Sequence, residues 1–487
     1  MTGVMRFTKN LSRKFMVRAF FGVLLVYHLL LPYNAASQVN LCDISLSDQI
    51  TLASDSIPLF SPQISVSGDT IHAIWFALDI FQTSSNDGIQ YCHSFDGGES
   101  FSSVVTIISS DSAFSPGIIT CSDEFVYVSY TGFMDGIFGI IFQRSTDAGI
   151  TWEQPEMIIP NTRPRLIGAI EMSVYIHYES QRGGNNGLLR SDDNGATWQV
   201  VNSDMLLLDD FQLTSNMFHG VGTITGVHSE VEYYYSPNQG ASWYASEIIS
   251  REDPVTSIQP KIAVNAVGTI YIVWNDTGNV MLRRSNGYDE DDNLLWLPRI
   301  VVSADRYAVF LDVGTTGKFV TVVWDNYEFD KRYVQNCHSA DEANNFCPKD
   351  TLSLGSNSGE PCVAVSGGSI HYVWSESIDM GGAILYRHGT AREIVQPTTH
   401  VLMQNYPNPV NNITHITHIE YVLTIPEQVR IVLYNILGQR VTTLVDEYQE
   451  AKNYKLSIDA NQFPTGVYFY RLMTPHFSET KKLVILR

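Results

Sequence analysis

The residues of this sequence that are best able to do chemistry are short acidic side chains in a recurring pattern. Four stretches match S-x-D-x-G-x-[ST]-[WF], with Asn238 in place of the aspartate in the last one. A carboxylate at this spacing can accept hydrogen bonds from the backbone of its own turn, while the glycine takes a positive φ. We therefore expect these residues to build turns and not to catalyse a reaction. They are Ser94, Asp96, Gly98 and Phe101; Ser145, Asp147, Gly149 and Trp152; Ser191, Asp193, Gly195 and Trp198; and Ser236, Asn238, Gly240 and Trp243.

Two other acidic stretches could take part in chemistry. The run at residues 289–292 offers oxygen ligands that suit calcium, although such a run is more often a solvated loop. Glu232 stands beside three tyrosines, but this segment leads directly into the fourth copy of the pattern and is typical of a strand. No nucleophile elbow, phosphate-binding loop or metal-ligand spacing occurs in the sequence. We predict no catalytic residue, no metal site and no cofactor, with calcium as the only ion left open.

The chain contains six cysteines, an even number that permits disulfides in an exported protein. Cys337 and Cys347 are ten residues apart across a predicted turn and form the best candidate pair. The same two residues could instead be reduced and buried. The other four are Cys42, Cys92, Cys121 and Cys362, and none of the six has the spacing of a zinc site.

The elements that would position these residues repeat about every fifty residues. SPQISVSGDTIHAIW, QPKIAVNAVGTIYIVW and EPCVAVSGGSIHYVW each contain a proline, an alternating apolar strand, a glycine turn and a second strand closed by tryptophan. Period-two alternation about a tight turn is typical of a β-hairpin with one buried face. Weaker copies end at Tyr130, Tyr178 and Trp324, and a diverged one ends near Thr225. The repeat therefore predicts seven units between about residues 50 and 395.

With the acidic pattern added, the repeat resembles the Asp-box, or BNR, repeats of sialidase-like β-propellers. Residues 337–346 and 285–296 look like eroded further copies. Two hairpin strands, one strand before the box and one after it make a four-stranded blade, so the resemblance implies an all-β propeller. We favour seven blades, with six as the alternative because sialidases have six. The strand at residues 50–52 is the candidate for closing the ring by completing the last blade.

The resemblance also raises the question of sialidase activity. Sialidases hold the substrate carboxylate with three arginines, the first of them early in the propeller, whereas no arginine or lysine occurs here between Arg18 and Arg144. A bidentate guanidinium is hard to replace in carboxylate binding, so this absence argues against sialic acid hydrolysis. A rebuilt triad is the remaining alternative. Its members would be Arg163 or Arg165, Arg283 or Arg284, and Arg332.

The front of the chain has the pattern of a cleavable signal peptide, which we predict over residues 1–37. Five basic residues among the first 18 precede an apolar run at residues 19–31 and small residues at 35–37. A membrane anchor is the alternative, but the run falls short of the roughly 20 apolar residues that span a bilayer. We therefore expect no transmembrane span in the mature protein. Cleavage near Ser37 removes those five of the 30 basic residues and leaves 25 against 51 acidic ones. This balance makes nucleic acid and anionic membranes poor partners.

The pattern changes after the Pro and Thr cluster at residues 396–399, where a propeller over residues 38–397 would give way to a domain over residues 398–487. Alternating strands separated by Leu-Gly and Pro-Thr-Gly turns predict a small C-terminal β-sandwich. Three ordered stretches resemble the type A sorting domain of type IX secretion cargo; a carbohydrate-binding module is the alternative. The matching residues are Asn405, Pro407, Asn408, Pro409, Gly438, Pro464, Gly466, Tyr468, Lys481 and Lys482.

Together these features predict a protein that is secreted or held on the outer surface of a Gram-negative bacterium. The resemblance implies the type IX secretion machinery as a partner. For the propeller we favour non-catalytic binding of an extracellular glycan or protein, because propellers offer a central binding face and no catalytic set is visible. A divergent glycoside hydrolase (sialidase-like) or lyase is the first alternative, marked by two carboxylates about 5 to 10 Å apart at the channel mouth. A structural protein of the surface or matrix is the second.

Overall fold

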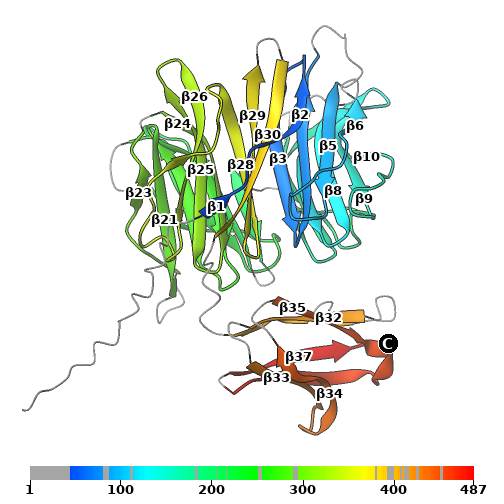
Figure 1. The fold of residues 1–487 in the computed structure, drawn as a ribbon. Coiled ribbons are helices and arrows are strands. Elements are labelled where there is room, and N and C mark those ends of the chain that lie inside the picture. Colours follow the sequence, from blue (N-terminus) through cyan, green and yellow to red (C-terminus); the bar gives the residue numbers. More distant parts are fainter. Residues whose placement is uncertain are drawn as a thin grey trace, which may run out of the picture. The chain divides into compact units, whose positions relative to one another are not determined.

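The computed structural model describes most of the chain from residue 44 onward. The described residues are 44–79, 87–109, 113, 115–180, 185–203, 205, 207–214, 217–250, 255–288, 294–305, 307–378, 381–391, 400–405, 408–410, 416–423, 427–449, 453–475 and 477–486. The predicted signal peptide at residues 1–37 and the acidic run at residues 289–292 lie outside them. Within the described ranges, regular structure is almost entirely β-strand (Figure 1). In this part of the chain no helix is long and apolar enough to cross a membrane.

Residues 44–391 form seven antiparallel sheets of four or five strands within the described ranges. The first four sheets contain β3 (Leu59–Ser67), β4 (Thr70–Ala77), β5 (Gly88–Ser94) and β6 (Val105–Ser109); β7 (Ile118–Ser122), β8 (Phe125–Met134), β9 (Ile137–Ser145) and β10 (Glu156–Pro160); β11 (Thr162–Ile170), β12 (Ser173–Ser180), β13 (Gly187–Ser191) and β14 (Gln199–Asn202); and β15 (Asp210–Leu213), β16 (Phe218–Ile224), β17 (Glu230–Ser236) and β18 (Tyr244–Ile248).

The last three sheets also follow the order of the chain, except that the final one gains strands from its beginning. They contain β19 (Ser257–Val264), β20 (Ile270–Asp276), β21 (Asn279–Tyr288), β22 (Leu294–Trp296) and β23 (Ile300–Ser303); β24 (Ala308–Thr316), β25 (Phe319–Glu328), β26 (Lys331–Ser339) and β27 (Asp350–Thr351); and β28 (Ser358–Ser366), β29 (Ser369–Ile378) and β30 (Gly381–Ala391) with β1 (Ile44–Leu46) and β2 (Ile50–Asp55).

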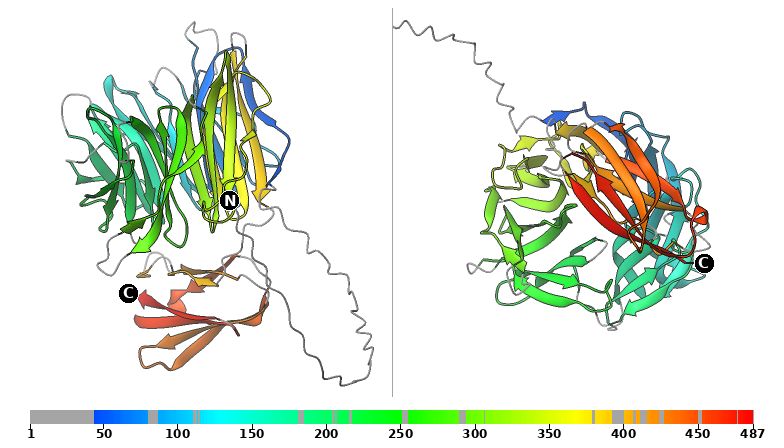
Figure 2. Two further views of the ribbon diagram at one scale, coloured as in Figure 1. Left: turned by 90° about the vertical axis from the view of Figure 1, so that its left-hand side faces the viewer. Right: turned by 90° about the horizontal axis from the view of Figure 1, so that it is seen from below.

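The sheets are arranged around a central axis, and the first hairpin strand of each sheet lies against that of the next (Figure 2). β28 of the last sheet in turn contacts β3 of the first, so the ring is closed. β2 pairs with β30, Ile50 opposite Tyr386 and Thr51 opposite Leu385. A strand from the start of the propeller therefore completes its last sheet, as the sequence predicted for residues 50–52.

Tryptophans at equivalent hairpin positions fill the space between neighbouring sheets. They are Trp75, Trp274, Trp324 and Trp374, and none is more than 1% exposed. An aromatic side chain of this size buries about 150–250 Å² of surface, which makes it a major contributor to a core. The aromatic residue that closes each repeat in the sequence is thus part of the packing between sheets.

The cysteines do not pair as their spacing predicted. Cys337 is a free thiol on β26, where it packs in the apolar cluster between the fifth and sixth sheets. Its thiol donates a hydrogen bond to the Cys347 carbonyl oxygen over 2.8 Å, and burial raises its pKa to about 12. Cys347 is disulfide-bonded, but not to Cys337. The predicted Cys337–Cys347 bond is wrong because the Cys337 side chain points into the core.

Residues 401–485 form a β-sandwich around a core of their own, as predicted. One core cluster contains residues from both sheets, among them Ile419, Ile431, Tyr470 and Leu483. One sheet has the order β31 (Val401–Leu402), β32 (Ile416–Val422), β35 (Asn453–Asp459). The other has the order β34 (Arg440–Gln449), β33 (Glu427–Asn435), β36 (Gly466–Met473), β37 (Ser478–Ile485), and the short 3-10 helix η1 (Ala460–Gln462) precedes β36.

Candidate functional site

Four of the strands nearest the axis share an irregularity near their start. The pairing register of β3, β19, β24 and β28 shifts at this point. One residue of each shift has a left-handed backbone, namely Ser61, Gln259, Phe310 and Glu360, with φ of 51°, 55°, 49° and 54°. A β-bulge of this kind changes the direction in which the following side chains point. The residues two positions further on, which line a common pocket, are Gln63, Lys261, Asp312 and Cys362.

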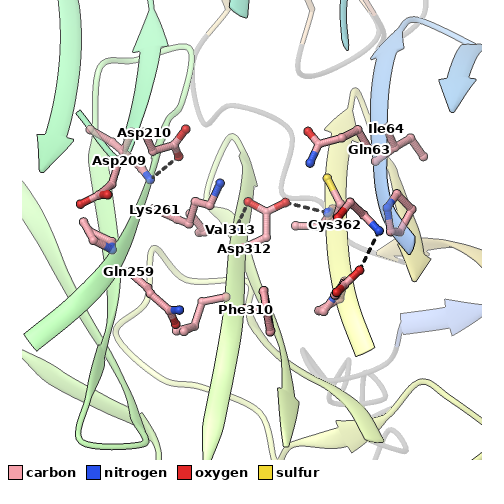
Figure 3. A pocket seen from close by; sticks show the side chains of 18 of the residues that line it. Gln63, Ile64, Asp209, Asp210, Gln259, Lys261, Phe310, Asp312, Val313 and Cys362 are labelled. Atoms are coloured by element: carbon pink, nitrogen blue, oxygen red, sulfur yellow. Dashed lines mark hydrogen bonds between the residues drawn. The ribbon is translucent and has the colours of Figure 1, made fainter. Parts of the chain in front are cut away.

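This pocket has a volume of about 460 Å³ and lies between strands that surround the axis (Figure 3). Strands β3, β15, β19, β24 and β28 contribute its lining, so five of the sheets meet there. Nine of the 20 lining residues have polar side chains, and four of these are carboxylates. The polar members are Asp209, Asp210, Asp312, Glu360, Lys261, Gln63, Gln212, Gln259 and Ser61, and the aromatic members are Phe211 and Phe310.

Carboxylates of the pocket also connect neighbouring sheets. Asp210 Oδ2 accepts a hydrogen bond from the backbone N–H of Ile262 over 3.0 Å, which joins the fourth sheet to the fifth. Asp312 Oδ2 accepts one from the backbone N–H of Val363 over 2.8 Å, which joins the sixth sheet to the seventh. These carboxylates therefore have a fixed orientation before any ligand binds.

Lys261 occupies the corresponding position on β19, where an ammonium group can donate hydrogen bonds but cannot accept them. Its side chain extends between Asp210 and Asp312 (Figure 3). These carboxylates, Asp210 above all, raise the pKa of Lys261 well above its ordinary value. Burial raises the pKa of Asp210, and the charge of Lys261 opposes that rise. Lys261 is therefore a charged group that is neutralised within the pocket.

Phe310 of the pocket lining and Tyr327 of β25 contact the same arginine, Arg332, and this pair of rings is called the aromatic rim below. They are 46% and 42% exposed, and the Arg332 guanidinium lies 5.3 and 5.4 Å from their ring centres. Nε and Nη2 of Arg332 both donate to the buried Asp325 carboxylate. Burial raises the pKa of Asp325 to about 6, although Arg332 acts in the opposite direction. The arginine thus supports the two rings while its own charge is balanced.

The Asp-box residues lie at the other end of the sheets. Ser94, which begins the first box, pairs with Ile71, whereas the bulge of β3 lies at the opposite end of the same hairpin. Asp96 accepts hydrogen bonds from the Ser94 hydroxyl over 2.7 Å and from the Ser100 hydroxyl and backbone N–H over 2.5 and 2.9 Å. The bonds from Ser100 and Ser94 lower the pKa of this carboxyl. Equivalent bonds hold the turns at Asp147, Asp193 and Asn238.

The aromatic residue that ends a box packs against the preceding sheet, and not only against its own turn. The ring pairs are Phe101 with Tyr386, Trp152 with Tyr91 and Trp198 with Phe142, with centres 4.8, 5.0 and 4.9 Å apart. The box glycine comes equally close, because a Cβ at Gly149 would lie 1.7 Å from the Tyr91 hydroxyl. Each of these boxes therefore fastens one sheet to its neighbour.

Replacing Trp198 by alanine is expected to lower the free energy of unfolding by roughly 2 to 4 kcal/mol, because it removes the edge-on contact with Phe142. Urea denaturation followed by fluorescence measures this change. Val200→Ala is the matched control, since Val200 lies on β14 of the same sheet and is 51% exposed. An exposed position should cost no more than about 0.5 kcal/mol. Equal losses in both variants would contradict the fastening role of Trp198.

The alternative arginine triad is not gathered at the pocket. Among the described residues that line it, Lys261 is the only basic one. Arg332 reaches the aromatic rim but is bound to Asp325. Three of the other candidates have partners elsewhere: Arg165 faces Glu179, Arg283 binds Glu247, and Arg284 binds Glu342 and Asn344. Arg163 lies on β11, outside the pocket lining. Glu232 lies on strand β17, away from the pocket lining. In the described ranges, no three His, Cys, Asp or Glu side chains are placed to hold a metal ion.

The pocket residues Asp210, Lys261, Asp312 and Glu360 were missed at the level of sequence. A signal for two of them was present in the repeats SPQI, QPKI and EPCV, which share a proline and a final Ile or Val but vary on both sides of the proline. The residue after the proline is the one that each bulge directs into the pocket. Variation beside a fixed proline is what a binding face on a repetitive scaffold requires.

In the sorting domain, the structure brings the first and last predicted stretches together. The Asn408 side chain donates to the Lys482 carbonyl oxygen over 2.9 Å and accepts from the Val484 backbone N–H over 2.8 Å. Asn405 is 1% exposed and donates to the Thr417 hydroxyl over 2.8 Å. The segment that opens the domain is therefore tied to its last strand, β37.

The other sorting residues lie in turns or on β37. Gly438 has a φ of 74° in the turn between β33 and β34, and Gly466 begins β36. The Tyr468 hydroxyl donates to the Pro464 carbonyl oxygen over 2.8 Å. Lys481 pairs with Glu479 over 2.8 Å, while Lys482 is exposed. Pro409 follows a cis peptide bond, and Pro407 lies outside the described residues.

A family model matches the C-terminal part of the chain. Residues 404–486 match the family model described as a secretion system C-terminal sorting domain. No curated protein matches the chain. The chain is thus a secreted or cell-surface protein that carries a sorting domain.

Solved structures similar to the propeller include enzymes that act on acidic sugars. An ulvan lyase bound to a glucuronate–sulfated rhamnose unit is 10% identical, with a TM-score of 0.50 over 69% of this chain and 95% of that chain. A Dyadobacter fermentans protein of unknown function is 11% identical, with a TM-score of 0.46 over 72% and 99%. A Trypanosoma rangeli sialidase is 9% identical, with a TM-score of 0.39 over 87% and 83%. At these identities the likeness concerns the fold, which is a sialidase-like β-propeller.

Proposed function

We propose that this chain is cargo of the type IX secretion system of a Gram-negative bacterium, and that its propeller binds a neutral glycan without catalysis. The sorting domain at residues 404–486 supports the route. The observation that carries the binding proposal is the pocket with its charged and amide side chains, together with the aromatic rim, of which Phe310 lines the pocket. Binding uses protein groups alone, so neither calcium nor another cofactor takes part.

The pocket and its rim offer the two kinds of contact that a sugar needs. Aromatic rings pack against the apolar C–H face of a pyranose, and Phe310 and Tyr327 expose such rings. Carboxylates and amides orient hydroxyl groups, and the pocket supplies both kinds at Asp312, Glu360 and Gln63. A protein ligand would need a flatter and larger apolar area than this pocket provides.

The charge of the pocket favours a neutral ligand. Four carboxyl groups accompany one lysine among its described lining residues, and that lysine lies between Asp210 and Asp312. A uronate, sialate or sulfate would enter without a free cation to pair with, and it would face like charges in a partly desolvated site. The propeller therefore shares its fold with enzymes that act on acidic sugars, but the charges of its described pocket residues do not suit an acidic sugar.

A glycoside hydrolase is the second candidate, because the pocket contains two carboxyl groups that face each other across Lys261. Burial raises the pKa of Asp210, as a general acid requires. However, backbone N–H groups of the next sheets already donate hydrogen bonds to Asp210 and Asp312. This engagement supports binding over proton transfer.

The mature chain, from residue 38 onward, should bind neutral oligosaccharides on a glycan array and should release no fluorophore from a panel of fluorogenic glycosides. Phe310→Ala and Tyr327→Ala are each expected to weaken binding roughly 10- to 30-fold by removing a stacking surface. Phe95→Ala is the control, since this exposed ring lies in the first Asp box.

Turnover of any glycoside would refute the proposal of non-catalytic binding and would support the glycoside hydrolase. Exclusive binding of acidic glycans would refute the assignment to neutral ones. Silence in both assays would favour a structural role on the cell surface or in the matrix. Binding that disappears with EDTA would show that an ion does take part.

A further inference from the structure

The turn between β33 and β34 of the sorting domain exposes two large aliphatic side chains. Ile436 is 68% exposed and Leu437 is 76% exposed, and we call this pair the apolar tip. The sandwich core does not need them, because it is filled by other residues of β33 such as Ile431 and Leu433. Polar residues would serve equally well in a turn of this kind.

Hydrogen bonds within the turn fix the shape of the apolar tip. Asn435 Oδ1 accepts from the backbone N–H groups of Leu437 and Gln439, each over 3.0 Å. The backbone N–H of Asn435 donates to the Gln439 carbonyl oxygen over 3.0 Å, and that of Gly438 donates to the Asn435 carbonyl oxygen over 2.9 Å. Gly438 reverses the chain with a φ of 74°. The backbone that carries the two side chains is therefore held in one conformation, and little backbone ordering remains to be done when the tip binds.

A pair of exposed aliphatic side chains on such a turn suits insertion into an apolar pocket of another protein, since burial of such groups drives association. The domain that carries the tip matches a family whose role is sorting by a secretion system, so a protein of that system is the partner that must recognise it. We propose that Ile436 and Leu437 dock in an apolar pocket of the export machinery. This inference rests on the proposed export route and identifies the surface that the route uses.

The test compares full-length variants in a host that has the type IX system, with protein measured in the periplasm and in the medium. The double variant Ile436→Ser with Leu437→Ser is expected to weaken docking about 100-fold, which corresponds to about 2.8 kcal/mol. Release into the medium should fall at least about tenfold, and the protein should accumulate in the periplasm. Tyr448→Ser is the matched control, because Tyr448 is 64% exposed on β34 and should be released normally.

Three further measurements keep the outcomes distinct. Ile436→Val with Leu437→Met preserves the apolar character and should restore release, and an unchanged melting temperature for the serine variant shows that the domain is folded.

A chain ending at residue 403 is measured in parallel, and release of that truncation would disprove the export route itself. Normal release of the serine variant, while the truncation is retained, would overturn the docking role alone. A tip-dependent dimer in size-exclusion chromatography would also overturn it, since the occupant would be a second copy.

Discussion

Removing residues 404–487 is expected to leave the protein in the periplasm of a host with the type IX system, with essentially none in the medium. The truncation deletes strands β32 to β37 and the whole matched region, so no sorting surface remains. Immunoblots of periplasm and medium against a periplasmic marker measure the distribution. The effect should be close to complete, because a sorting signal is either present or absent.

Two controls make this result specific. The truncated propeller should stay soluble and keep its melting transition, because its core clusters contain no residue after Tyr386. A reporter that carries the signal peptide and residues 404–487 should gain release. Unchanged release of the truncated chain would refute the sorting assignment.

Acidification is expected to destabilise the propeller strongly between about pH 6.5 and 4, because three buried histidines can take up protons only in the unfolded chain. Burial lowers the pKa of His72 to about 3, and that of His219 and His371 to about 4, from an ordinary value of 6.5. Each histidine bonds a buried tyrosine hydroxyl over 2.7 to 2.8 Å. Their contribution is therefore complete above pH 6.5 and is lost as the pH falls.

The expected loss of unfolding free energy follows from the width of this pH range. Each histidine costs about 1.4 kcal/mol of unfolding free energy per pH unit, so the three together cost roughly 8 kcal/mol at pH 4.5. Asp325, whose pKa burial raises to about 6, titrates in the same range with the opposite sign and offsets part of this loss. The total remains comparable with the whole stability of a typical domain, about 5–15 kcal/mol.

Urea titrations at pH 7.0 and 4.5 test this expectation. The single variant His371→Gln keeps a polar partner for Tyr386 and should reduce the pH dependence by about one third, whereas His418→Gln, at an exposed site in the sorting domain, should leave it unchanged. An identical pH dependence in all three proteins would show that His371 is not a source of the acid sensitivity.

Much of the fold could be predicted because each repeat shows in its sequence which residues pack between the sheets. The tryptophans at 75, 274, 324 and 374 recur at the same place in the hairpin, and the structure buries all four. The sorting domain was predictable for a similar reason, since its Gly438 and Pro464 mark turns between alternating strands. Where the alternation is unbroken, periodicity identifies which face of a strand is buried.

The pocket could not be predicted from the same pattern, because a bulge breaks the alternation where it matters. At Gln259 the backbone turns left-handed, and the following Lys261 points to the axis although period-two counting gives no reason for it. The disulfide prediction failed for a related reason, since sequence distance from Cys337 does not tell which face of β26 its side chain occupies. The direction in which a side chain points depends on the register of its strand with the neighbouring strand, whereas the position of the strand in the sequence does not.

The pairing of β2 with β30 has a consequence for the order of events during export. On the proposed export route, β1 and β2 leave the inner membrane first and stay unpaired until β30 has followed them. Until then these strands can pair with wrong partners, including a second chain that donates its own first strands. Once β30 has paired with them, the two ends of the propeller sequence are joined within one sheet. A single cut in a surface loop would therefore leave the ring held together by strand pairing.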